Sequence, residues 1–554
     1  MRKIGTDICI VGTGFSGTFI ANKLQGTSSR ILLVDRGAYL SRDRIEDNYS
    51  ENPYRTGKAP FKSSKDFPKL KEFIYDDPEF HNYDHVNSGK DAFTYSGHHA
   101  IGGTSLLWFG SAIRKVPNDF RTKSTYGFGV DWPISYSDLE EYYHQAELEM
   151  GVSGPPEDAF SPYRKDPFPL PPFQLPPGAI ELNHILKDKG FEVTPSHKAR
   201  LPIDTAERMA CCGAGTCWLF CPADARYNCL TTHLKDLRQS EQVDILDKIT
   251  ISRLIQKGDK IVEAVAFDRD GNEVRIQAQV FILAANAVEN ARILLLSQFH
   301  FLETGFKSRS MAIGKYLTDQ VGIWIPIRMP FNLYTGYEKT IQSTHSLSFY
   351  DGAFRKRHSS LVVEVFLSTV PFNSSLITNS KKAQKMVIDQ IQKGCFGNEL
   401  REKVFLNSLG KFKLCLEMEM MAEERNCVRL HRSRKNRFGD PIAEFHFSIW
   451  DQEYLNRSRK FYHKLFKKMV GDAGGHIGRA AKRNTFDHML GTCRMGVDPQ
   501  ESVVDENLKS HDHTNLYIVG GSAFPTAGST NPTLTIAALA LRCGNHLKKR
   551  LETG

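Results

Sequence analysis

The sequence lacks a long apolar run. No stretch approaches the roughly 18–20 continuous apolar residues that a membrane-spanning helix needs, and the apolar run at 361–370 is interrupted by Glu364. The sequence therefore argues against a transmembrane segment. The opening residues Met1-Arg2-Lys3 lead at once into Asp7–Val11 and then into glycines. This is not the pattern of a secretory signal, so we expect a cytoplasmic protein.

The chain also lacks a block of charge of one sign, an internal repeat and a low-complexity tract. Its 72 basic and 63 acidic residues are interspersed and leave a net charge of +9. A mixed, solvated surface explains this balance better than a basic binding patch, so we predict no nucleic acid partner. The 554 residues, 40% of them hydrophobic, suffice for two domains or one large composite domain with its own core.

Cysteines are sparse outside one short segment. Five of the eleven lie between 211 and 229, and the other six are scattered, as in a reduced protein without a disulfide framework. A disulfide clip within the segment fits this context poorly. A structural zinc site would use four thiolates, from Cys211 or Cys212 with Cys217, Cys221 and Cys229. An iron–sulfur cluster would also use thiolates, and a closing Cys-Pro is typical of ferredoxin-like runs; spacing alone does not choose the metal.

The first forty residues carry the pattern of a dinucleotide site. The apolar runs 8–11 and 31–34 predict two buried strands, and the glycines between them have the G-x-G-x-x-G spacing. Gly12 permits a tight turn, Gly14 lets a pyrophosphate approach the helix N-terminus, and Gly17 lets helix and strand pack closely. Asp35, at the end of the second strand, can accept hydrogen bonds from a ribose diol. The motif alone does not separate FAD from NAD.

A glycine and hydroxyl loop follows at 97–108. Gly102 and Gly103 allow close backbone approach to a flat ring or a phosphate, and Thr104 and Ser105 offer hydroxyl groups. By itself this segment would be taken for an ordinary turn.

Two further segments predict regular structure. Residues 280–296 read as a buried strand followed by an apolar helix, which would extend a parallel sheet, and a Gly-Asn turn precedes them at 271–272. Residues 131–139 lead into a helix for which Ser137 or Asp138 is the expected N-cap.

The last seventy residues hold the strongest local pattern after the N-terminus. His488 precedes a Gly-Thr-Cys-Arg-Met-Gly run, a buried strand is expected at 516–519, and Pro532 sets the first turn of a final helix around 537–547. Taken alone, His488 reads as a core histidine bonded to a carbonyl group. Taken alone, Asn531 reads as a helix cap.

Together these segments resemble the glucose–methanol–choline (GMC) oxidoreductase family. The resemblance rests on the N-terminal fingerprint, 102–108, 132–139, 284–296, Asp319 in a Gly-Lys-Tyr-Leu-Thr-Asp run, and 486–547. It implies an α/β fold with a Rossmann-like FAD-binding domain and a substrate domain built on an antiparallel sheet. The implied bounds are 1–40, 90–115, 200–300 and 484–554 for the FAD-binding domain, and 120–200 and 300–480 for the substrate-binding domain.

The resemblance also implies an activity. In that family an alcohol is oxidised while a histidine takes the hydroxyl proton, and His488 stands at that position. Asn531 stands where the family places a second His or Asn that bonds the substrate oxygen. An imidazole, with an unperturbed pKa of about 6.5, suits proton abstraction near neutral pH. The implied cofactor-binding residues are Gly12, Gly14, Gly17, Asp35, Gly103, Thr104, Ser105, Ile249, Gly521, Asn531, Pro532 and Thr533.

The chain departs from the family at three points. The 102–108 loop lacks the histidine that anchors FAD covalently in some relatives, so we expect noncovalent FAD. Gly520 replaces a usual acid, and Asn286 replaces a usual glycine. The latter two departures bear on local flavin contacts and leave the His488 and Asn531 pair untouched.

The cysteine segment is similar to one in the catalytic subunits of bacterial FAD-dependent sugar dehydrogenases. The likeness implies a 3Fe-4S cluster on Cys211, Cys217 and Cys221, with Cys212 as a possible alternate, that relays electrons to a cytochrome. It further implies a sugar or polyol substrate and export with a small signal-bearing subunit, so the periplasm is the alternative location. Two other hypotheses stay open: an oxygen-using alcohol or sugar oxidase with structural cysteines, and a non-catalytic flavin-binding electron-transfer subunit.

Overall fold

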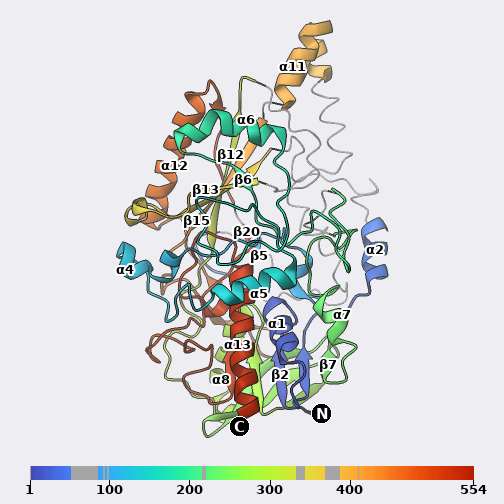
Figure 1. The fold of residues 1–554 in the computed structure, drawn as a ribbon. Coiled ribbons are helices and arrows are strands. Elements are labelled where there is room, and N and C mark those ends of the chain that lie inside the picture. Colours follow the sequence, from blue (N-terminus) through green and yellow to red (C-terminus); the bar gives the residue numbers. More distant parts are fainter. Residues whose placement is uncertain are drawn as a thin grey trace.

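The computed structural model describes residues 2–51, 85–91, 94–95, 99–214, 217, 220–331, 344–367, 387–409, 411–483 and 485–553. Figure 1 shows two stacked parts: the lower one holds both chain termini and a parallel sheet, and the upper one holds a broad antiparallel sheet. The α/β architecture predicted from the sequence is therefore confirmed. Within these residues, no helix combines the length and apolar character that crossing a membrane requires.

Five short strands of the lower part run parallel in the order β21-β11-β2-β3-β7. Their bounds are Leu516–Ile518, Val280–Leu283, Ile8–Val11, Ile31–Val34 and Val243–Leu246. Every residue of β2, β3 and β11 is buried, which is why these strands read as unbroken apolar runs. Helix α1 (Phe15–Leu24) follows the central strand β2, so it begins at the carboxyl edge of the sheet, where open α/β sheets bind ligands.

A second, four-stranded sheet has the order β1-β10-β9-β8. Its strands are Arg2–Gly5, Glu273–Gln277, Lys260–Phe267 and Thr250–Lys257. The β9–β10 hairpin turns through Gly271, whose φ of 84° is positive, at the predicted Gly-Asn turn. Helix α8 (Ala287–Phe299) follows β11, and the side chain of Asn286 caps it by accepting from two backbone N–H groups.

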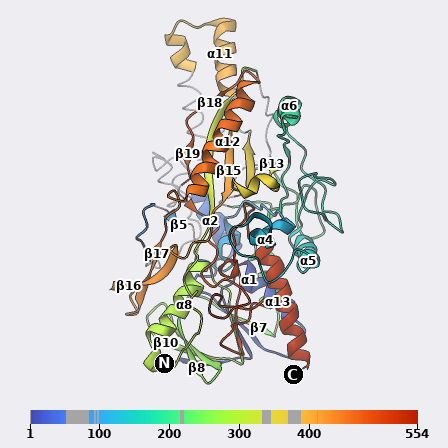
Figure 2. The same ribbon diagram turned by 90° about the vertical axis from the view of Figure 1, so that its left-hand side faces the viewer.

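The upper part is built on a seven-stranded antiparallel sheet of order β18-β12-β15-β14-β13-β6, with β19 also paired to β12. The strands are His476–Ile477, Gln320–Arg328, Lys411–Glu419, Leu361–Phe366, Thr344–Phe349, Thr194–Pro195 and Ala481–Lys482. Figure 2 shows α12 (Glu453–Gly471) lying along this sheet, and Tyr462 and Phe466 of the helix pack against Phe349 of β13.

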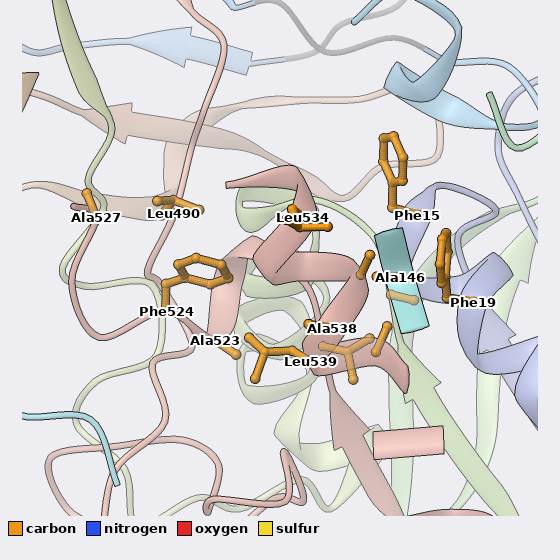
Figure 3. Packing of buried hydrophobic residues seen from close by; sticks show 14 of the residues in the cluster. Phe15, Phe19, Ala146, Leu490, Ala523, Phe524, Ala527, Leu534, Ala538 and Leu539 are labelled. Carbon is orange, nitrogen blue, oxygen red and sulfur yellow. The ribbon is translucent and has the colours of Figure 1, made fainter. Parts of the chain in front are cut away.

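The two ends of the chain share one core. Helix α13 (Thr533–Thr553) packs against α1 and α5 (Glu140–Met150) in the lower part. Figure 3 shows Leu534 and Ala538 of α13 near Phe15 and Phe19 of α1. A Cβ at Gly544 would lie 3.0 Å from Cβ of Lys23, so glycine allows this close helix contact. The start of α13 is thereby placed next to the start of α1.

The remaining described helices and strands are α2 (Arg42–Glu51), β4 (His85–Asn87), β5 (Thr94–Tyr95), α4 (Thr122–Tyr126), α6 (Pro177–Leu186), α7 (His233–Leu237), α9 (Phe301–Thr304), α11 (Gly397–Leu409), β16 (Cys427–Lys435), β17 (Pro441–His446) and β20 (Thr485–Phe486). One detail of the prediction was wrong. Helix α5 has Leu139 as its N-cap residue and no side-chain cap. Asp138 instead accepts from the backbone N–H of Ser135 (2.8 Å), which closes the preceding turn.

Candidate active site

The glycines after β2 leave room for a ligand at the start of α1. Gly12 has a φ of 108°, and a Cβ there would lie 2.7 Å from the carbonyl oxygen of Ala284. A Cβ at Gly17 would overlap the carbonyl oxygen of Gly12. Gly14, the N-cap residue of α1, has instead nothing within 4 Å of the position of a Cβ. The free N–H groups of the helix therefore face open space that suits a pyrophosphate.

Asp35 is held by the same turn. Its Oδ2 accepts from the backbone N–H and hydroxyl of Thr13 (2.8 and 2.6 Å), and its Oδ1 accepts from the N–H of Gly37 (2.8 Å). Burial raises the pKa of this carboxyl, and these hydrogen bonds oppose the rise. Because a carboxylate oxygen has two acceptor sites, Oδ1 retains capacity for a ribose hydroxyl. Ile249 lies beside it, since its N–H donates to the carbonyl oxygen of Asp35 (2.9 Å).

The 3-10 turn Gly103–Leu106 packs on the glycine turn. The N–H of Gly102 donates to the hydroxyl of Thr13 (2.9 Å), and a Cβ at Gly103 would lie 3.5 Å from Cα of Gly14. Two segments about ninety residues apart thus border the same space, as expected for residues that hold one dinucleotide.

The two hydroxyl residues of this turn differ in their surroundings. Thr104 is exposed, whereas Ser105 is buried. Ser105 donates to the carbonyl group of Gly102 (2.6 Å) and accepts from the N–H of Cys229 (3.0 Å). Ser105 therefore ties the loop to the cysteine-bearing segment. The predicted contact between Ser105 and the cofactor stays a prediction.

The turn after β21 brings the C-terminal motif to the same place. A Cβ at Gly520, whose φ is 86°, would lie 2.8 Å from the hydroxyl of Ser16 in α1. A Cβ at Gly521 would lie 2.8 Å from the carbonyl oxygen of Met489. The glycine that replaces the usual acid at 520 thus permits close contact with α1. The segment that follows His488 is consequently packed beside the nucleotide-binding helix.

His488 and Asn531 meet in this region. The side-chain Nδ2 of Asn531 lies 3.2 Å from Nε2 of His488, so the amide donates and the imidazole accepts. Both residues are half-buried. Burial, and secondarily the positive charge of Arg483, lower the pKa of His488 to about 3. The imidazole is therefore neutral near pH 7, with a lone pair on the nitrogen that a base would use.

The start of β12 holds both partners. The backbone N–H of His488 donates to Oδ2 of Asp319 (3.3 Å), and the side-chain amide of Gln320 donates to the carbonyl oxygen of Thr530, next to Asn531. Burial raises the pKa of Asp319 to about 8. Asp319, which directly precedes β12, and Gln320, the first residue of β12, thereby set the spacing of the pair.

A buried ionic network lies behind the segment 526–530. The guanidinium of Arg355 contacts Asp119 (2.8 Å) and Glu419 (3.1 Å), and all three side chains are almost fully buried. Glu419 accepts from the N–H of Gly528 (3.1 Å), and the ammonium of Lys115 donates to the carbonyl oxygen of Ala527. This network, which the sequence did not reveal, fixes the loop that carries Asn531.

One face of the seven-stranded sheet is polar close to this pair. Oxygen and sulfur atoms of Glu364, Cys415 and Glu417 lie within 4.8 Å of one another, and Arg483 pairs with Glu417. Burial raises the pKa of Glu364 to about 7, and Lys198 opposes the rise. In the sequence, Glu364 appears only as an interruption of an apolar run. The signal that was missed is a charged residue inside a strand that is otherwise buried.

The predicted cluster ligands occupy different environments. Cys217 and Cys221 are buried, Cys211 is half-buried and Cys212 is exposed, and each of the eleven cysteines is a free thiol. A disulfide clip is therefore absent. A tetrahedral zinc site with Zn–S bonds of about 2.3 Å would hold its sulfur atoms about 3.8 Å apart. Among the described residues, no three cysteine sulfurs come within 4.8 Å of one another.

Arginines join this segment to the loop on the nucleotide side. Arg200 donates to Sγ of Cys217 (3.4 Å). Arg226 donates to the carbonyl oxygens of Leu106 (2.8 Å) and Trp108. Burial raises the pKa of Cys211 and of Cys221, and the positive charges of Arg200 and Arg226 respectively oppose these rises. The two arginines offset burial only in part, so both cysteines are neutral thiols near pH 7, and the nearby positive charge would favour a negatively charged group bound to them.

Comparison with known proteins agrees with this geometry. The GMC oxidoreductase family matches the chain in two parts, over residues 196–321 and 422–540. The chain is 27% identical to the fructose dehydrogenase large subunit of Gluconobacter japonicus, over 100% of this chain and 99% of that one. It is 23% identical to the 2-methyl-1,2-propanediol dehydrogenase of Mycolicibacterium austroafricanum, over 99% and 96% of the two chains.

A solved structure shows the same fold. Pyridoxine 4-oxidase from Mesorbium loti superposes with a TM-score of 0.60 at 16% identity, covering 98% of each chain. The open space at Gly14 and the capacity left on Asp35 fit a dinucleotide cofactor. The chain thus belongs to the GMC oxidoreductase family and is an FAD-dependent oxidoreductase that acts on the CH–OH group of alcohols.

Proposed function

We propose that this enzyme oxidises a CH–OH group of a sugar or another polyol to a carbonyl group, with His488 and Asn531 as its catalytic residues. The observation that carries the proposal is the 3.2 Å contact between Nε2 of His488 and Nδ2 of Asn531. One substrate hydroxyl placed between these groups can give its proton to the imidazole while the amide donates to the oxygen. FAD, when bound, supplies the acceptor for the hydride that leaves the carbon.

The surroundings of the pair support its part in proton transfer. The lowered pKa of His488 keeps the imidazole unprotonated near neutral pH and therefore able to accept a proton. Asn531 stays hydrogen-bonded to the imidazole until substrate arrives, so the geometry is set in advance. We also propose that FAD binds noncovalently, held by the twelve cofactor-binding residues that the family resemblance implies.

The polar sheet face supports a substrate with several hydroxyl groups. Arg483, which lies close enough to lower the pKa of His488, also pairs with Glu417. Carboxylates and a guanidinium at such a site can bond additional hydroxyl groups, and a site built for such bonds discriminates strongly against analogues that lack them. Fructose and a propanediol, the substrates in the names of the two relatives, both carry more than one hydroxyl group.

We further propose that Cys211, Cys217 and Cys221, with Cys212 as an alternate, hold a 3Fe-4S cluster that passes electrons to a cytochrome. Three features support this: the sulfur atoms are too far apart for one zinc ion, two arginines face the thiols, and Arg226 bonds the loop on the nucleotide side. One relative is named a large subunit, which favours assembly with other subunits, including a small export subunit. Cell fractionation tests whether that assembly is periplasmic or cytoplasmic.

The decisive experiment is anaerobic mixing with a panel of sugars, polyols and simple alcohols. Loss of the oxidised flavin absorbance is expected with polyols, and His488→Ala should slow it by about 10²–10⁴-fold while leaving bound FAD in place. A His488→Ala enzyme that bleaches as fast as wild type contradicts the assignment of the base. Protein that takes up no flavin contradicts the whole proposal.

Acceptor choice separates the dehydrogenase from its alternative. Turnover with a redox dye together with bound iron supports the proposal. Rapid turnover with oxygen in iron-free protein supports an oxygen-using oxidase with structural cysteines.

A further inference from the structure

Three potential metal ligands meet at the edge of the upper sheet. His345 lies on β13, His197 follows β6, and Asp158 lies in the segment between α5 and α6. Strands β6 and β13 lie side by side (Figure 1) and pair with His345 opposite Thr194. The ring centroids of His197 and His345 are 4.9 Å apart. One nitrogen or oxygen of each of the three residues lies within 4.8 Å of the others.

All three side chains are buried without adequate partners. The exposed fraction is 0% for His197 and 2% for both His345 and the Asp158 side chain. No ring nitrogen of either histidine, nor Oδ2 of Asp158, makes a hydrogen bond of good geometry, although both histidines lie within ion-pair distance of that oxygen. Nε2 of His197 lies 3.3 Å from that oxygen but without the alignment of a hydrogen bond. Buried polar atoms are almost always paired, so this concentration of unpaired ones indicates a missing ligand.

The spacing matches a single metal ion. Zinc bonds of about 2.0–2.1 Å to nitrogen and oxygen in a tetrahedral site place the ligand atoms about 3.3 Å apart. Oδ2 of Asp158 lies 3.3 Å from Nε2 of His197 and 3.9 Å from Nε2 of His345. We propose that Asp158, His197 and His345 form a zinc site that links the segment between α5 and α6 to the edge of the substrate sheet.

Charged side chains of both signs surround this site. Arg164, near His197, pairs with Glu147, and Lys198, near His345, faces Glu364. Glu147 is shared between Arg164 and Arg114, whereas Asp158 is the carboxylate that faces the two histidines directly. The ring of Phe168 packs against that of His197, with the centroids 4.7 Å apart and the planes tilted by 53°.

A second group of potential metal ligands lies next to positively charged side chains. Glu364, Cys415 and Glu417 also lie within 4.8 Å of one another, but Lys198 and Arg483 neutralise their carboxylates. We therefore do not assign a metal to that group, and it provides a matched control.

The test measures zinc in the purified full-length enzyme after gel filtration, by mass spectrometry of the metal. About one zinc ion per chain is expected in wild type and in the control Cys415→Ser, with at least about tenfold less in Asp158→Asn and His345→Gln. Cobalt loaded in place of zinc should give weak visible bands without sulfur-to-metal charge transfer, because no thiolate is a ligand.

Three results would overturn the proposal: zinc absent from wild type incubated with zinc chloride, zinc retained in Asp158→Asn, or zinc lost only in Cys217→Ser. If the variants fold poorly, the melting temperature of the wild-type enzyme with and without a chelator tests the site. A chelator should lower its melting temperature, zinc should restore it, and an unchanged melting temperature with no metal released contradicts the site.

Discussion

Burial lowers the pKa of His488, so the imidazole stays unprotonated over most of the pH range in which an enzyme is assayed. Its pKa is lowered to about 3, first by burial and then by Arg483. A base works only while it is unprotonated, which for this histidine is at every pH above that value. An exposed imidazole, with a pKa of about 6.5, would lose about tenfold in rate for each pH unit below it.

We therefore predict that the rate of flavin reduction stays level from about pH 8 down to about pH 5. Stopped-flow reduction at saturating substrate measures this directly. An acid limb with an apparent pKa near 6.5 would show that the imidazole is hydrated during the reaction and would contradict the burial described here.

The fingerprint glycines have separable roles. A Cβ at Gly17 would overlap the carbonyl oxygen of Gly12, whereas a Cβ at Gly14 would stand in open space. We predict that Gly17→Ala prevents stable folding. Gly14→Ala should preserve the melting temperature of the flavin-free protein but weaken FAD binding by at least about tenfold, since its methyl group occupies the pyrophosphate position.

FAD titration of the apoprotein, followed by flavin fluorescence, measures the second effect. Gly5→Ala is the control, because a Cβ there also meets nothing within 4 Å and lies outside the fingerprint. Equal FAD affinity in Gly14→Ala and Gly5→Ala would contradict the assigned pyrophosphate position.

Residues in short local motifs were predictable, and residues held by long-range contacts were not. Gly12, Asp35 and the two proposed catalytic residues belong to contiguous patterns whose spacing is visible in the sequence. The positions of Arg355 and Glu419 become meaningful only when four distant segments fold together. The residues next to Arg355 and Glu419 in the sequence give no pattern that predicts their contact.

At the level of elements, the ionic network at Arg355 joins the 3-10 turns Pro117–Phe120 and Ala353–Lys356 to strand β15 and the loop before α13. Replacing Arg355 by Met leaves the buried carboxylates of Asp119 and Glu419 with only Lys115 as a counter-charge, so we predict a loss of about 3–5 kcal/mol in the free energy of unfolding. Arg457→Met is the control. Its partner Glu453 lies 3.5 Å away, and the side chains are 46% and 91% exposed, so the loss should stay below about 1 kcal/mol.

Urea denaturation of both variants, followed by circular dichroism, measures the difference. Equal losses would mean that the network contributes no more than a surface ion pair. The Arg355→Met variant should also bleach its flavin more slowly, because the same network fixes the loop that ends at Asn531.

The parallel strands could be located from sequence, while the pairing of the antiparallel sheet could not. Strands buried on both faces, such as β2, β3 and β11, read as unbroken apolar runs. In the upper sheet, β12 pairs with β15 across some ninety residues, and polar residues such as Glu417 sit among buried apolar ones. That register depends on tertiary contacts, which a local pattern does not contain.

The N-cap of α5 failed for a related reason. Ser and Asp favour both helix caps and tight turns. The bond from Ser135 to Asp138 closes a turn one step before the helix begins. The side chain of Asp138 thus accepts a hydrogen bond in the turn before the helix and does not cap the helix itself.

At the level of the whole molecule, the proposed catalytic residues and the proposed cluster ligands lie on different segments of the chain. The loop at 102–108 lies between these segments. His488 and Asn531 come from the C-terminal end, and the cysteine segment reaches the nucleotide side through Arg226 and Trp108. Substrate oxidation and electron delivery should therefore fail independently when each segment is altered.

We predict that Cys217→Ser loses bound iron and loses at least about tenfold in cytochrome c reduction, yet bleaches its flavin with substrate at the wild-type rate. His488→Ala should do the reverse, keeping its iron and losing substrate-driven bleaching. Cys427→Ser, a half-buried thiol outside the segment, is the matched control and should behave as wild type. If cytochrome c reduction survives the loss of iron, electrons leave the flavin directly, and the arginines around Cys217 serve only to stabilise the fold.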